Sequence, residues 1–195
     1  FVYARIGVGA GFVVGEQLYR GSAAGAGEIG HTTIVPDGGE PCRCGNSGCL
    51  ETLVSEPAIV RRAEVLAAQE PEGILAHRLQ REEETAIERI FGAARAGDPT
   101  AHAMLEERAG YMGIAMANLV NVLNPDLIVF GGIFAQGKDL LLPTIEKVVR
   151  QRARSSRDSP GSGASSTCAG TPRPSLNLLR CRVWRLALSP ASPAL

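Results

Sequence analysis

The chain has 195 residues, enough to bury one sizeable hydrophobic core, and 45% of them are hydrophobic. It contains no apolar run of the roughly 20 residues that span a bilayer and no basic and apolar leader, so we expect a cytoplasmic protein with no membrane partner. The zero net charge is the sum of an acidic body and a basic tail, residues 151–195, which has seven arginines and only one acidic residue, Asp158. An acidic body lacks the clustered Lys and Arg that contact nucleic-acid phosphates.

The first 50 residues predict short strands followed by a structured loop. Phe1–Ile6 is β-prone, and Phe12–Val14 and Gln17–Arg20 flank the turn pair Gly15-Glu16, a pattern typical of a hairpin. Because the chain opens on Phe1 inside such a run, we expect it to begin partway through a longer protein. Residues 21–50 are rich in Gly and Cys and have little periodicity, so something other than a hydrophobic face must order them.

The middle of the chain predicts helices and one buried strand. Apolar spacing predicts helices over 56–69 and 84–96, joined by a polar connector. The capping pair Asp98-Pro99 begins a long helix that Asn124-Pro125 ends. A buried strand over 127–130, the pair Gly131-Gly132 and a helix near 139–152 follow. This order predicts an α/β layer with a parallel component.

The composition changes after about Ala153. The last residues hold nine Ser and five Pro, with little periodicity outside a stretch near 176–188. Such a segment cannot easily offset its ordering entropy, so we expect disorder there, and the composition suggests a reading-frame slip. The sequence therefore divides into a folded lobe, residues 1–152, and a tail, residues 153–195.

Three cysteines lie within eight positions, close to a histidine. His31, Cys42, Cys44 and Cys49 supply one imidazole and three thiolates, the donor set of a closed tetrahedral zinc site. A closed site has no position for a catalytic water, so its role would be structural. The alternative interpretation is three unrelated thiols and a surface histidine.

The segment Gly27-Glu28-Ile29-Gly30-His31, followed by Cys42-Arg43-Cys44-Gly45-Asn46-Ser47-Gly48-Cys49-Leu50-Glu51, resembles the signature of the ROK family (repressors, open reading frames and sugar kinases). The resemblance covers roughly residues 1–152. It implies the C-terminal lobe of an actin-like ATPase (ribonuclease H-like) fold with a zinc-ordered loop, and commonly a homo-oligomer. It also implies that Glu28, His31 and Glu51 line a pocket for a hexose or amino sugar.

Two glycine segments match nucleotide-binding positions of the family. Gly7, Gly9 and Gly11 match its second phosphate-binding segment, and Gly131 and Gly132 match the start of its adenosine-facing loop. Both sets are equally typical of turns. Family kinases usually carry a Thr just before the second of these loop glycines, where this chain offers Ile6 or Val8.

The resemblance leaves more than one function open for the parent protein. It is either a sugar-responsive transcriptional regulator, whose DNA-binding domain would precede Phe1, or a sugar kinase that uses ATP and Mg²⁺. The kinase's first phosphate loop and catalytic Asp would also precede Phe1, so we assign no catalytic residue and expect no phosphorylation by this chain alone. A third possibility is a truncated product without function.

Overall fold

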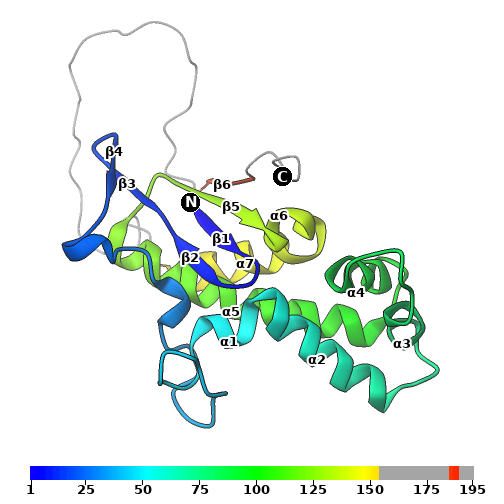
Figure 1. Ribbon diagram of the computed structural model, residues 1–195. Helices are drawn as coiled ribbons and strands as arrows, with labels where there is room; N and C mark the ends of the chain where they lie inside the picture. The colour runs from blue at the N-terminus through cyan, green and yellow to red at the C-terminus, as the bar shows by residue number, and fades with distance from the viewer. Residues whose placement is uncertain (154–184, 189–195) are drawn as a thin grey trace, which may run out of the picture.

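The structure, a computed structural model, describes residues 1–153 and 185–188 (Figure 1). Its main sheet has the strand order β2-β1-β5-β6. These strands are Val8–Ala10, Val2–Ala4, Leu127–Gly132 and Arg185–Leu188. β1 runs antiparallel to β2 and parallel to β5, and β5 runs parallel to β6. The α/β class with a parallel component is therefore confirmed.

One face of this sheet is covered by two helices. Val2, Ala4, Ile128 and Phe130 are buried, as alternation along a strand requires when one face packs on a core. The helices are α5 (Pro99–Leu123) and α7 (Lys138–Arg152), which lie side by side (Figure 1). They approach so closely that a Cβ on Gly113 would lie 2.7 Å from the Cβ of Val148.

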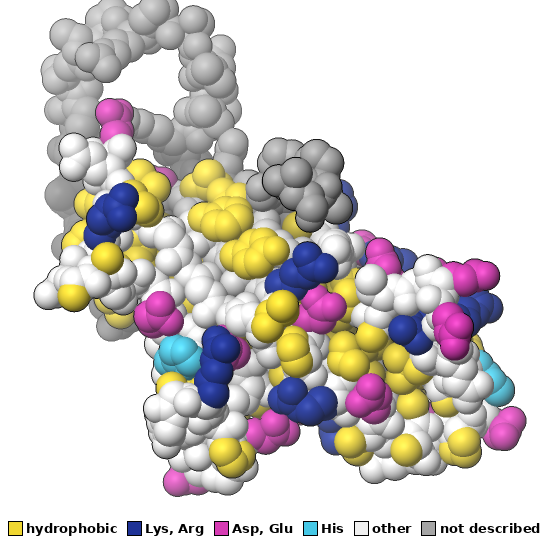
Figure 2. Space-filling view, viewed as in Figure 1, with side chains coloured by type: hydrophobic (Ala, Val, Ile, Leu, Met, Phe, Trp, Pro, Cys, Tyr) yellow, Lys and Arg dark blue, Asp and Glu magenta, His cyan; other side chains and the backbone are white. Residues whose placement is uncertain are grey.

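The predicted hairpin is present as β3 (Phe12–Val14) and β4 (Gln17–Tyr19). Gly15 and Glu16 have φ angles of +57° and +65°, the positive values that a two-residue hairpin turn of the primed type requires. The hairpin projects from one end of the molecule (Figure 1). Hydrophobic side chains gather on the surface above the strands (Figure 2). The exposed hydrophobic residues of the strands include Tyr3, Val13 and Leu18.

The longer helices have the bounds that their sequence signals predict. α2 spans Glu56–Gln69 and α5 ends at Leu123, while α4 spans Ala86–Arg95. The polar connector is only partly correct, because it contains α3 (Ile74–Leu79), a helix too short to produce a periodic pattern. Two further short helices, α1 (Leu50–Val54) and α6 (Ile133–Gln136), were also missed. Within the described residues, no helix combines the length and the apolarity needed to cross a membrane.

Asp98 joins α3 to the start of α5. The residue is 3% exposed, one carboxylate oxygen accepts the Ala101 N–H at 2.7 Å, and the other accepts the Leu75 N–H at 2.9 Å. Asp98→Ala should therefore lower the free energy of unfolding by about 2 kcal/mol, since it removes a cap and leaves a second buried N–H without its acceptor. Urea denaturation measures this. Thr85→Ala, which removes an exposed cap of α4, is the control and should cost about 1 kcal/mol. Equal losses in the two variants would contradict the double role of Asp98.

The tail contributes one described strand. β6 pairs with β5 in register, Leu127 opposite Arg185 and Phe130 opposite Leu188. The expectation of disorder does not hold for these four residues, because their backbone continues the parallel sheet. The remaining residues of that prediction, 154–184 and 189–195, lie outside the described part of the chain.

Candidate functional site

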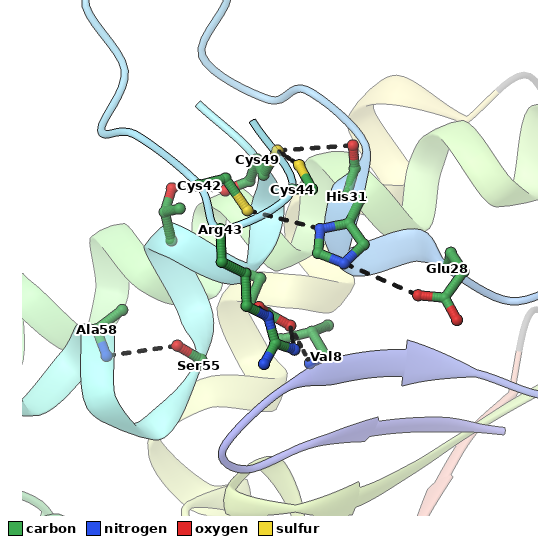
Figure 3. A network of polar contacts seen from close by, with 11 residues as sticks. Val8, Glu28, His31, Cys42, Arg43, Cys44, Cys49, Ser55 and Ala58 are labelled. Carbon is green, nitrogen blue, oxygen red and sulfur yellow. Dashed lines mark hydrogen bonds and ion pairs between the residues drawn. The ribbon is translucent and has the colours of Figure 1, made fainter. Parts of the chain in front are cut away.

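The candidate site is built on the loop between β4 and α1, beside the edge strand β2 (Figure 3). Two isolated bridges close the loop on itself, one between Thr33 and Cys49 and one between Pro41 and Ser47. Gly48 has a φ of +69°, and a Cβ there would lie 1.8 Å from the carbonyl oxygen of Val35. Only glycine permits this approach, which turns the chain back just before Cys49.

The folded loop brings four potential metal ligands together. The ligand atoms of His31, Cys42, Cys44 and Cys49 all lie within 4.8 Å of one another. The Cys44 and Cys49 sulfurs are 3.7 Å apart, and Nδ1 of His31 is 3.6 Å from the Cys42 sulfur. A tetrahedral zinc ion with ordinary bond lengths requires about 3.8 Å between sulfurs and about 3.6 Å between nitrogen and sulfur. The donor set and its spacing therefore fit a closed zinc site.

The thiols of this cluster differ in their environment. Burial, reinforced by the neighbouring thiols of Cys44 and Cys42, raises the pKa of Cys49 to about 12. The pKa of the exposed Cys44 is lowered, first by a backbone hydrogen bond from Asn46 and then by the thiol of Cys42. Without a cation the cluster would keep a proton on Cys49 at neutral pH. A metal ion that binds here must displace that proton, so its affinity should fall as the pH falls.

His31 faces two ways, toward the thiols and toward a carboxylate. Its Nδ1 points to Cys42, and its Nε2 lies 3.9 Å from the exposed carboxylate of Glu28 (Figure 3). Both residues lie on or next to the short 3-10 helix Ile29–His31. A metal on Nδ1 would fix the ring orientation and leave Nε2 available for a polar ligand beside Glu28.

Glu51 lies on α1 and is only 8% exposed. Its Oε2 accepts the backbone N–H of Val8 at 3.0 Å. The guanidinium of Arg43 lies over the same carboxylate, with Nε 3.0 Å from Oε1 and Nη2 3.4 Å from Oε2. No role was predicted for Arg43, although its place between Cys42 and Cys44 was a signal that the sequence contained. Arg43 and Glu51 thus connect strand β2 to the loop that carries the four candidate metal ligands, residues 31–49, which we name the metal loop for this potential.

The two glycine segments meet at the carboxyl end of β1. Ala4, the last residue of that strand, pairs with Val8 on one side and with Gly132 on the other. Gly132 has a φ of +67°, and a Cβ there would lie 2.0 Å from the Ala4 carbonyl oxygen. Carboxyl ends of parallel strands are the usual ligand-binding edge of α/β sheets. Glu51 reaches the same edge, because its Oε2 is 3.1 Å from the position of a Cβ on Gly7.

Several backbone N–H groups of the first glycine segment already have acceptors. The Val8 N–H donates to Glu51, the Ala10 N–H to the Gly27 carbonyl at 2.8 Å, and the Gly11 N–H to the Phe1 carbonyl at 2.8 Å. Gly9 lies opposite Tyr3 within the β1–β2 pair, and Gly131 lies opposite Tyr3 in β5. Gly9, Gly11 and Gly131 therefore have a place in the sheet, and a nucleotide contact at any of these positions remains a prediction.

Known proteins resemble this chain over most of its length. The ROK family model matches residues 1–164. A glucokinase from Halalkalibacterium halodurans is 40% identical over 141 residues, which are 72% of this chain and 43% of that protein. A xylose repressor from Caldicellulosiruptor bescii is 37% identical over 155 residues, 78% of this chain and 38% of the repressor.

A solved structure extends the similarity to the fold. The ROK family glucokinase from Streptomyces griseus, in complex with glucose and AMPPNP, superposes with a TM-score of 0.70 at 32% sequence identity. The match covers 82% of this chain and 52% of that protein. The chain thus spans less than half the length of these two curated relatives, one a kinase and one a repressor. Its sequence and its fold place the chain in the ROK family.

Proposed function

We propose that this chain is the sugar-binding lobe of a sugar-responsive transcriptional regulator, with Glu28, His31 and Glu51 as sugar ligands. The observation that carries the proposal is the arrangement of His31, whose Nδ1 faces the cysteines while its Nε2 faces Glu28. Two carboxylates and an imidazole can accept hydrogen bonds from neighbouring hydroxyls and so fix the orientation of a sugar ring. The DNA contacts would come from another part of the protein, as would any further contacts to the sugar.

In this proposal the cysteine cluster holds a structural zinc ion. The ion would add to the ordering of the loop between β4 and α1, which gives the core only a few hydrophobic side chains, Ile29 among them. The residues of the chain would bind the sugar: His31 held in one orientation, Glu51 held by Val8 and Arg43, and Glu28 exposed beside His31. Zinc would therefore support the sugar site without contacting the sugar.

Two observations favour the regulator over the kinase. Neither Ile6 nor Val8 offers the hydroxyl usual in the phosphate segment of family kinases. The N–H groups of Val8, Ala10 and Gly11 are already bonded within the protein. A sugar kinase that uses ATP and Mg²⁺ is the second candidate, because both glycine segments meet at the carboxyl end of β1. In either case we expect this chain alone to show no sugar-dependent ATP consumption.

Calorimetric titration of the zinc-loaded chain tests the proposed site, with glucose, xylose and N-acetylglucosamine as probes. At least one of these sugars should bind, and Glu51→Gln should weaken its binding by about 10- to 100-fold, because the site loses a charged acceptor. Glu40→Gln is the matched control: Glu40 is an exposed carboxylate in the same loop, 3.8 Å from Arg61, and its loss should change nothing. The proposal is wrong if none of the three sugars binds, or if the two variants behave alike. Sugar-dependent ATP consumption by the longer parent protein would support the kinase instead.

A further inference from the structure

The ion pair between Arg43 and Glu51 joins an exposed side chain to a buried one. The Arg43 side chain is 70% exposed, whereas that of Glu51 is 11% exposed. The guanidinium contacts both carboxylate oxygens, and the Val8 N–H contacts one of them. An exposed arginine that merely balanced charge would not need both contacts. Two contacts in a rigid fork restrict the rotation of the carboxylate.

The direction of the Arg43 side chain depends on the metal loop. Arg43 lies between Cys42 and Cys44 in a tight turn. Two hydrogen bonds close this turn: the Cys42 N–H donates to the Asn46 carbonyl at 2.7 Å, and the Gly45 N–H donates to the Cys42 carbonyl at 3.0 Å. The flanking thiols face the ligand cluster, and the arginine between them points away from it (Figure 3), to the Glu51 carboxylate 3.0 Å from its Nε. Holding both thiols on one ion would hold this turn, and with it the position of the guanidinium.

We propose that Arg43 is a positioning residue through which the metal loop fixes the Glu51 carboxylate, and that it thereby sets which sugar hydroxyls Glu51 accepts. The part that concerns sugar rests on the proposed function. A carboxylate has about four lone-pair sites. The Val8 N–H and the Arg43 Nη2 both donate to Oε2, and Arg43 Nε lies 3.0 Å from Oε1, so both oxygens are held and the carboxylate keeps a defined free direction. Loss of Arg43 frees the carboxylate to rotate and to accept hydroxyls without a fixed geometry.

The amide proton of Val8 gives a readout that needs no sugar, because this N–H donates to Glu51. In the zinc-loaded chain, Arg43→Ala should speed hydrogen exchange at Val8 about tenfold. Arg43→Lys should do the same, since a lysine supplies the charge without the fork. The amide of Gly11, bonded to the Phe1 carbonyl in the same segment, is the internal control and should not change. Full protection of Val8 in Arg43→Lys would overturn the inference, as would unchanged protection in Arg43→Ala.

Removal of zinc tests the coupling. Chelation should raise the hydrogen-exchange rate of the Val8 amide in the wild-type chain. In Arg43→Ala, where this rate is already raised, chelation should cause no further increase. Each rate is compared with that of the Gly11 amide in the same protein. An equal further increase in both proteins would overturn the proposed route through Arg43.

Sugar titration supplies the second readout. Arg43→Ala and Arg43→Lys should each weaken binding about tenfold and reduce the discrimination between glucose and xylose, with zinc content unchanged. Arg61→Ala, which breaks an exposed pair with Glu40 in the same loop, should leave affinity and discrimination at wild-type values. Wild-type affinity and discrimination in both Arg43 variants would overturn the role in sugar recognition. If the wild-type chain binds no sugar, the proposed function fails, and the Val8 measurements still decide whether Arg43 couples the metal to Glu51.

Discussion

Replacing Cys44 and Cys49 together by serine should reduce bound zinc from about one ion per chain to almost none after dialysis. The reason is the geometry of the cluster: four donors lie within 4.8 Å of one another, and serine hydroxyls are poor ligands for this ion. Two backbone bridges also hold the loop between β4 and α1, but an ion bound to four of its side chains would add to the stability of the folded chain, so its loss should lower that stability. With zinc a thousandfold above its dissociation constant, the wild-type chain gains about 4 kcal/mol from binding, and the variant should gain none of it.

Metal analysis and thermal unfolding with and without chelator measure these effects. Glu40→Gln is the control, because it changes an exposed side chain of the same loop that is not one of the four donors; that variant should keep its zinc. The affinity of the wild-type chain should fall as the pH falls, since protons compete with the ion for the thiolates and the pKa of Cys49 is already raised to about 12. Stoichiometric zinc in the double variant would show that these cysteines do not hold the metal.

Replacing Gly27 by alanine should destabilise the chain by about 4 kcal/mol, a large part of the stability of a typical domain. Gly27 has a φ of +103°, a conformation that costs an L-residue about 1–3 kcal/mol. Its Cβ would also lie 1.8 Å from the carbonyl oxygen of Ala10, and relieving this clash costs about as much again. The shift would separate Gly27 from β2, breaking the hydrogen bond from the Ala10 N–H and displacing the neighbouring Glu28.

Gly97→Ala separates the two causes. Gly97 has a similar φ of +89°, but a Cβ there would meet nothing within 4 Å, so this variant should lose only the backbone part, about 2 kcal/mol. Urea denaturation gives both values, and Gly27→Ala should also lose sugar binding at temperatures where it remains folded. Equal losses for the two substitutions would mean that the chain near Ala10 can move aside without cost.

The elements that the sequence predicted well are those whose determinants are local. α2 begins after the capping residue Ser55 and α5 after Asp98, and each has a proline within its first turn. These signals act within a few residues, so they can be interpreted without knowledge of the fold. The missed helices are those without such periodic support: α3 depends on Leu75 and Ala76 packing into the core, and α1 on the turn at Cys49. The pairing of β6 with β5 could not be predicted from local signals, because it joins residues far apart in the chain.

The same division holds for the candidate site. The sequence by itself predicted the candidate metal donors, because one imidazole and three thiols in one short loop have few other uses, and it determined the family through the motif that contains them. Only the tertiary structure decided that Arg43 contacts Glu51, that Glu51 accepts the Val8 N–H, and that both glycine segments meet at Ala4. An arginine can pair with any carboxylate within its reach, and the acidic body offers many. The partner is selected by the direction in which the folded loop points the side chain, and that direction depends on contacts between segments that are distant in the sequence.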